Sequence, residues 1–116
     1  PGLDWALGEA STNLYVGVAR HKRGEKLSAM RFIQSHVVDR IIDLAHRMEQ
    51  AQPVSRDIFS SERRFEFRYP ELAMCLPQWC QGYENNIESA LAILAFLEKK
   101  FDVNPAMAKA IRDFCD

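Results

Sequence analysis

Hydrophobic positions in the first half of the chain recur at the spacing of one helix face, and a glycine separates two such stretches. In residues 3–23 the apolar positions of one face are Leu3, Leu7, Ala10, Leu14 and Val18. In residues 25–50 they are Leu27, Met30, Val37, Ile41, Leu44 and Met48. Since Gly24 leaves so short a connection, we expect these two long helices to lie antiparallel.

The hydrophobic pattern of residues 54–70 is compatible with either a strand or a helix. Phe65, Phe67 and Tyr69 alternate with charged residues as in a strand, but a lone strand would have no partner in an otherwise helical chain. We therefore predict a short helix over residues 61–68 that ends before Pro70, because the residue preceding a proline is steered away from helical geometry.

The last third of the chain predicts three more helical segments. The first begins at Pro70, is divided by Pro77 and stops at Gly82. A pattern resembling a capping box, Asn85 with Glu88, opens the next. Its predicted inner stripe is Ile87, Leu91, Leu94 and Leu97. Asn104 and Pro105 provide a cap and a first-turn proline for a final helix. The pattern thus predicts an all-α fold, an antiparallel up-and-down bundle of four or five helices in a single domain over residues 1–116.

Composition narrows the classes of function. The 15 basic and 16 acidic residues give a formal net charge of -1, so no overall field attracts nucleic acid or an anionic membrane. The longest apolar run, residues 90–97, is too short to span a bilayer, and the first ten residues do not resemble a signal peptide. The three cysteines form no Cys-x-x-Cys pair. We expect a cytoplasmic protein with no membrane partner, for which nucleic acid is an improbable ligand.

Two sets of side chains could carry chemistry. His36, Asp39, Asp43 and His46 share one face of the predicted second helix and could hold a transition metal, but a solvated face of ion pairs explains them as well. We predict no metal in this chain. Among the aromatic residues, side chains with a polar handle could line a ligand pocket or form the rim of the core. These are Trp5, Tyr15, Trp79 and Tyr83.

Arginine and histidine also recur at a short spacing in the second helix. Arg31 precedes His36 by five positions, and Arg40 precedes His46 by six. This spacing resembles the Arg-x4-6-His signature of the HEPN-family ribonucleases, which are helical bundles. The resemblance implies RNA cleavage if one pair faces an open cleft, because acid–base chemistry needs both groups at one site.

A second resemblance covers most of the chain. Residues 23–29, RGEKLSA, the following MRFIQSHVVDRIIDL and the later FSSERRFEFRYPEL are similar to the helical C-terminal domain of small-molecule nucleotidyltransferases of the aminoglycoside and lincosamide adenylyltransferase type. In that group an N-terminal domain with a Gly-Ser element and an Asp-x-Asp pair holds magnesium and a nucleotide triphosphate. Neither motif occurs here. The resemblance therefore implies the second domain of a longer protein, which would bind the acceptor and not catalyse alone.

This resemblance implies partners and residues. The partners are an N-terminal nucleotidyltransferase domain of the same protein, a small-molecule acceptor and a second copy in a homodimer. Glu9 on the first helix is the candidate base toward the acceptor. The candidate substrate-binding residues are Tyr15, His36, Arg40, Trp79 and Tyr83. A HEPN-like ribonuclease and a helical protein-interaction module remain the alternatives. We also expect the chain alone to show no nucleotidyl transfer and no tight binding of Mg-ATP, since it has no phosphate-cradling glycine loop.

Overall fold

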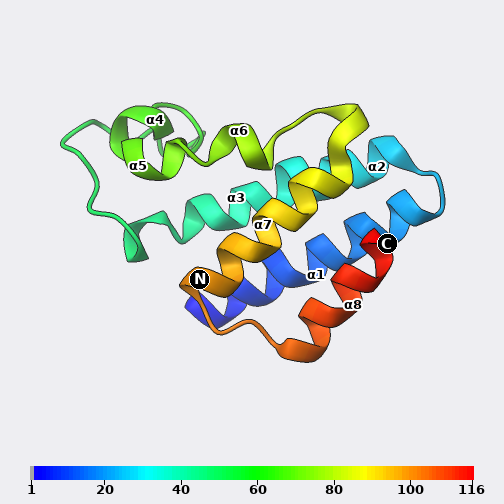
Figure 1. Ribbon diagram of the computed structural model, residues 1–116. Coiled ribbons are helices and arrows are strands. Elements are labelled where there is room, and N and C mark those ends of the chain that lie inside the picture. Colours follow the sequence, from blue (N-terminus) through cyan, green and yellow to red (C-terminus); the bar gives the residue numbers. More distant parts are fainter. Residues whose placement is uncertain (1) are drawn as a thin grey trace.

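The computed structural model describes residues 2–116 and contains helices and no strand in that range (Figure 1). The all-α prediction is therefore confirmed. The elements are α1 (Leu3–Lys22), α2 (Lys26–Arg31), η1 (Phe32–His36), α3 (Val37–Asp43), η2 (Ala45–Arg47), α4 (Phe65–Arg68), α5 (Pro70–Ala73), α6 (Leu76–Trp79), η3 (Tyr83–Asn85), α7 (Asn86–Lys100) and α8 (Pro105–Cys115).

Helix α1 is the centre of the molecule. It contacts α2, α3, α7 and α8, and the rod formed by α2, η1 and α3 runs back along it in the opposite direction (Figure 1). The turn between them is built on Gly24, whose φ of 85° is a left-handed conformation that suits glycine. The core combines buried side chains of α1, of the second rod, of α7 and of α8 with Trp79.

The close approach of the first two rods depends on Gly17. A methyl group at this position would lie 2.6 Å from Ile33 Cγ1, which is far inside van der Waals contact. This glycine gives α1 a flat surface against which Ile33 packs.

The second rod contains a π-helical turn at Phe32–His36. Five of its buried positions are spaced by four, at Ala29, Ile33, Val37, Ile41 and Ala45, and Val38 and Leu44 are buried beside them. In a regular α-helix a spacing of four drifts by about 40° per step, whereas the wider π turn removes part of that drift and keeps these residues on one face. The predicted face is confirmed at Val37, Ile41 and Leu44, which are buried, and was wrong at Leu27, which is 54% exposed.

The second rod also ends earlier than predicted. Regular helix stops at Asp43, and a 3-10 turn over Ala45–Arg47 follows it. The reason is tertiary, because Ala45 packs into a second small core and Glu49 accepts hydrogen bonds from the backbone of α5. The Glu49 carboxylate lies 3.2 Å from Glu71 N and 2.8 Å from Leu72 N, which are free N–H groups at the start of that helix.

Helices α4, α5 and α6 form a broken stretch above the second rod (green in Figure 1). The predicted helix over residues 61–68 is shortened to Phe65–Arg68, because Arg64 adopts a left-handed conformation with φ 62°. The predicted division near Pro77 is confirmed, with the break just before α6.

Helix α7 departs from its predicted cap and stripe. Asn85 makes no side-chain capping bond, and Leu91 of the predicted inner stripe is 38% exposed. The buried face instead starts at Asn86, and Ser89 lies on it. For α8 the predicted cap is confirmed, since Asn104 Oδ1 accepts a hydrogen bond from Met107 N at 3.0 Å.

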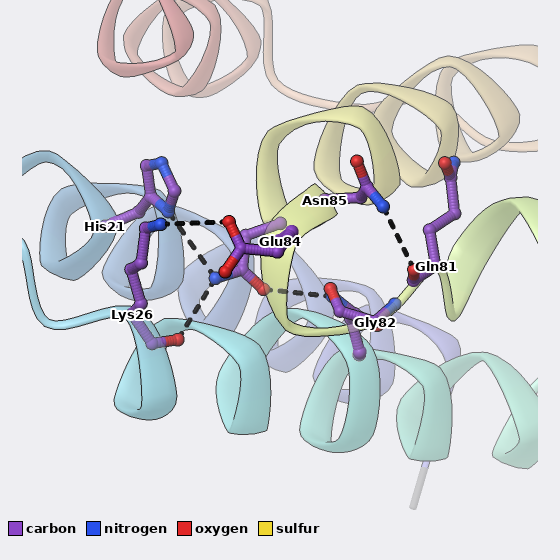
Figure 2. Close-up of polar contacts among 8 residues, drawn as sticks. His21, Lys26, Gln81, Gly82, Glu84 and Asn85 are labelled. Carbon is purple, nitrogen blue, oxygen red and sulfur yellow. Dashed lines mark hydrogen bonds and ion pairs between the residues drawn. The ribbon is translucent and has the colours of Figure 1, made fainter.

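A polar network fixes the start of α7 against the second rod (Figure 2). The buried Asn86 amide donates to the Lys26 carbonyl oxygen at 3.0 Å and accepts from Gln34 Nε2 at 2.9 Å. Gln34, inside the π turn, also pairs with both backbone groups of Gly82 at 2.8 Å. The Nζ of Lys26 lies 3.4 Å from a carboxylate oxygen of Glu84.

Candidate functional site

A polar hollow lies where the start of α1, the end of the second rod and the segment around α4 meet. Its volume is about 530 Å³. We call it the arginine hollow, and its lining residues are Trp5, Arg40, Ile42, Asp43, His46, Arg56, Ser61, Arg68 and Tyr69.

Four stretches of chain place these side chains together. Trp5 comes from the first turns of α1, and Arg40 from the last turn of α3. His46 lies on the 3-10 turn that replaces the predicted continuation of the helix. Arg68 lies at the end of α4, where its carbonyl oxygen accepts a hydrogen bond from Gln52 N at 2.8 Å. The early end of the second rod is thus what creates this hollow.

Asp57 shapes the loop that carries Arg56 into the hollow. Its carboxylate accepts hydrogen bonds from Phe59 N at 2.8 Å and Ser60 N at 3.3 Å, and pairs with Arg63 at 2.8 Å. The backbone bond from Phe59, followed by the bond from Arg63, lowers the pKa of Asp57 from its ordinary value. The loop is therefore held by an ionised carboxylate.

The electrostatics of the hollow are positive. Three arginines and one aspartate line it, which gives a formal charge of +2 with neutral histidine. Arg40 pairs with Asp43 at 2.9 Å. Within residues 2–116, Arg56 and Arg68 have no carboxylate within 4 Å, and the buried Nε of Arg68 has no hydrogen-bond partner.

Two aromatic rings hold the guanidinium groups. Arg40 lies over the ring of Trp5, with 5.5 Å between the guanidinium carbon and the ring centroid. Arg68 lies 5.0 Å from the ring centroid of Tyr69, which is buried. Such stacking restricts a guanidinium without using its N–H groups, so the N–H groups other than Arg40 Nε, which bonds to Asp43, have no protein partner among residues 2–116.

A second hollow, which we call the apolar groove, runs between α1 and α8. Its volume is about 580 Å³, and small or apolar side chains dominate its walls. Its lining residues are Asp4, Leu7, Gly8, Ser11, Thr12, Tyr15, Asp102, Val103, Asn104, Ala106, Met107 and Ala110. The groove offers surface for packing and few groups for acid–base chemistry.

The predicted substrate-binding residues do not converge on one site. Arg40 lines the arginine hollow and Tyr15 lines the apolar groove. His36 is exposed beside the Phe32 ring, and Tyr83 is exposed beside Lys26. Trp79 is 1% exposed and packs edge-on against Phe96 in the core.

Glu9, the candidate base, is half-buried on α1 and lines neither of these two hollows. It follows Trp5 by four positions, so the two share a face of α1. The carboxylate is therefore one helical turn along from a wall of the arginine hollow.

The histidines and carboxylates of the second rod do not form a metal site. Within residues 2–116 no group of three or more His, Cys, Asp or Glu side chains is placed to hold a metal ion. His36 and His46 lie on opposite sides of the break at Leu44. Burial raises the pKa of Asp39, with Arg40 opposing this effect and Glu62 adding to it. The histidines and carboxylates of the second rod are therefore not arranged as ligands of a magnesium–nucleotide site.

Two cysteine thiols, those of Cys80 and Cys115, are not activated by their surroundings. Burial raises the pKa of Cys80 and of Cys115, which disfavours the nucleophilic thiolate.

In the part of the chain from residue 2 onward, no helix is both long and apolar enough to cross a membrane.

Sequence reasoning missed most of the arginine hollow. Arg56, Arg68 and Ser61 were not candidates, although four arginines between positions 56 and 68 were a visible signal. Their convergence with Arg40 and His46 depends on a loop whose path the periodicity does not encode.

Comparison with known proteins gives no further guide. No family model matches the chain, and neither curated proteins nor solved structures give a significant match.

Proposed function

We propose that this chain is the acceptor-binding helical domain of a nucleotidyltransferase-like protein and that the arginine hollow binds the acceptor. The supporting observation is that four separate stretches of chain bring charged and aromatic side chains into one hollow of about 530 Å³. Hollows of this size and mixed lining suit small molecules. The chain resembles such domains in residues 23–44 and 59–72.

In this proposal the chain binds and orients the acceptor. Magnesium and the nucleotide triphosphate would be held by an N-terminal domain of the same protein and would supply the phosphoryl chemistry. Arg40 and Tyr69 are held by packing and present a fixed surface, and Glu9 lies on the same face of α1 as Trp5. Glu9 would then accept a proton from an acceptor hydroxyl that extends past Trp5.

The binding test uses the isolated chain, labelled with ¹⁵N, and a set of small polar hydroxyl compounds. We expect ligands to shift amide signals of residues 40–46 and 56–69. Arg40→Gln should weaken binding about tenfold, as the loss of one charged contact does. Arg31→Gln changes an exposed arginine outside the hollow and is the matched control. Ligand shifts confined to residues of the apolar groove would contradict the assignment.

The remaining details of the arrangement are also proposals. The chain reverses direction between α1 and the second rod, again along the α4–α6 stretch, and again at α7, which supports the up-and-down bundle (Figure 1). Four exposed apolar side chains in residues 58–74 support a homodimer or an interface with the N-terminal domain. They are Ile58, Phe59, Phe67 and Met74. Sedimentation equilibrium of the wild type and of Phe59→Ser tests the dimer, which should dissociate in the variant.

One observation favours a second candidate, a HEPN-like ribonuclease. Arg40 and His46 both line the arginine hollow, whereas Arg31 and His36 are exposed and line neither this hollow nor the apolar groove. A histidine beside an arginine can move a proton while the guanidinium stabilises a phosphate. His46→Ala should abolish cleavage of a single-stranded RNA oligonucleotide, and His36→Ala should not. Absence of cleavage by the wild type would exclude this candidate.

A further inference from the structure

The arginine hollow has a charge pattern that points to a class of ligand. Arg40 already has a counter-ion in Asp43 and a ring beneath it in Trp5. Within residues 2–116, the side chains of Arg56 and Arg68 have neither an ion pair nor a hydrogen bond. Two cationic forks therefore face one hollow without a protein partner.

Arg68 is the more informative of the two. Its Nε is buried and has no hydrogen-bond acceptor, which is an unfavourable state for a charged donor. Its guanidinium is nevertheless held beside Tyr69, whose ring packs against Phe65 in the second small core. Arg68 also lines the hollow, and a charged side chain without a protein acceptor suggests that its acceptor is an external group.

We propose that the arginine hollow binds an oxyanion, the phosphate or carboxylate group of a small molecule, through Arg68 and Arg56. This inference rests on the proposed role of the hollow as the small-molecule site. Planar guanidinium forks match the paired oxygens of carboxylate and phosphate, and stacking on an aromatic ring fixes their orientation. The formal charge of +2 also disfavours polycationic acceptors and favours one that carries a negative charge.

The other lining residues fit the remainder of such a ligand. Trp5 is 47% exposed and offers an aromatic edge at one wall, while Ser61 offers a hydroxyl at another. An aromatic or otherwise planar body joined to an oxyanion would use the walls and the arginines together.

The test compares four probes that share one ring: phenyl phosphate, benzoate, phenol and benzylamine, at constant ionic strength. We expect phenyl phosphate and benzoate to give saturable amide shifts for residues 40–46 and 56–69, and phenol and benzylamine to bind at least tenfold more weakly. The ratio of phenyl phosphate to benzoate affinity then identifies the preferred oxyanion.

Substitutions of Arg56 and Arg68 test whether these two side chains bind the anions. Arg68→Gln should weaken the binding of phenyl phosphate and benzoate at least tenfold. Arg56 is exposed, so Arg56→Gln leaves the core intact, and it should weaken their binding severalfold. Arg31→Gln should leave the affinity for both anions unchanged. Arg68→Lys keeps the charge and loses the fork, so it should bind less tightly than the wild type even if Arg68→Gln proves unstable.

The outcomes separate the two proposals. Equal binding of phenol or benzylamine in the hollow would overturn the oxyanion inference and leave the acceptor site standing. Loss of anion binding in Arg31→Gln would show non-specific attraction and overturn it too. If none of the four probes shifts the amide signal of any residue in the hollow, both proposals are overturned.

Discussion

Gly17 shows how a single residue sets the distance between two helices. The position is buried, and the Cβ that alanine would add lies 2.6 Å from Ile33 Cγ1 and 3.2 Å from Phe32 Cβ. A glycine inside a predicted helix indicates a close helix crossing, and the structure has one at this position. The sequence could indicate it because glycine inside a helix is unfavourable without a packing reason.

We expect Gly17→Ala to destabilise the protein by about 1–2 kcal/mol. Overpacking costs about 1–3 kcal/mol, and the better helix propensity of alanine offsets up to about 1 kcal/mol of it. Gly8→Ala is the control, because nothing lies within 4 Å of the added atom in the same helix. Urea unfolding should show Gly8→Ala equal to or more stable than the wild type. Equal stability of the two variants would contradict the account.

Asn86 is a buried polar residue that predictions from hydrophobic pattern assign to the surface. Its amide bonds to Lys26 O at 3.0 Å and to Gln34 Nε2 at 2.9 Å. Asn86→Leu leaves the Lys26 carbonyl without that donor, so we expect a loss of about 1–3 kcal/mol in the free energy of unfolding. Asn85→Ala removes a longer, half-buried bond of 3.3 Å and should cost less than about 1 kcal/mol. Thermal unfolding of both variants measures the difference.

Among the elements, the loop between η2 and α4 depends most on charge. The three bonds to the Asp57 carboxylate all favour its ionised form, so its pKa in the folded protein is lower than its ordinary value of 3.8. For a carboxyl group with a lowered pKa, the stabilising effect is present above the ordinary value and is lost as the pH falls through the folded value.

We therefore expect acid to loosen this loop below pH 3.8. Amide exchange at Phe59 and Ser60 should accelerate relative to the intrinsic rate as Asp57 is protonated, and Asp57→Ala should show fast exchange at every pH. Glu62→Gln, in the same loop, should behave as the wild type. Protection that persists in Asp57→Ala would show that backbone packing alone holds the loop.

The element ends show what a local pattern can determine. The Asn104 cap, the Gly24 turn and the break near Pro77 follow from residues within one or two turns of the boundary, and the structure has all three. The end of the second rod was predicted too late because Glu49 bonds to the distant start of α5. A partner 22 residues away leaves no trace in local periodicity.

At the scale of the whole molecule, most charge is spread along helix faces, and cationic side chains gather in the arginine hollow and at the end of α1. The carboxylates of residues 2–116 form no cluster that could hold a metal ion. Phosphoryl transfer needs a metal to neutralise phosphate charge. Arginine side chains without a metal ion attract phosphate, and this attraction weakens with salt.

We expect the isolated chain to bind ATP weakly, no more tightly with magnesium than without it, and to transfer no nucleotidyl group. Calorimetry with and without Mg²⁺ at two salt concentrations measures this. The isotherms should weaken with salt and should not strengthen when Mg²⁺ is added. Micromolar, salt-insensitive binding that requires Mg²⁺ would mean that the chain contains a nucleotide site and that the domain is misassigned.

The sequence by itself determined the helical class, the turn at Gly24, the caps of the last helix and the close crossing at Gly17. These depend on periodicity and backbone preference, which act within a few residues. It also identified Arg40 as a candidate, but through helix spacing and not through its present neighbours.

The tertiary structure decided the π turn, the burial of Asn86 and Trp79, and the arginine hollow. The hollow joins Trp5 to Arg68 across 63 positions of sequence, so its geometry depends on how α1, the second rod and α4 pack. Packing is a property of pairs of distant surfaces, and the pattern along one segment does not contain it. For this reason the helices could be predicted from the chain, and the site that they enclose could not.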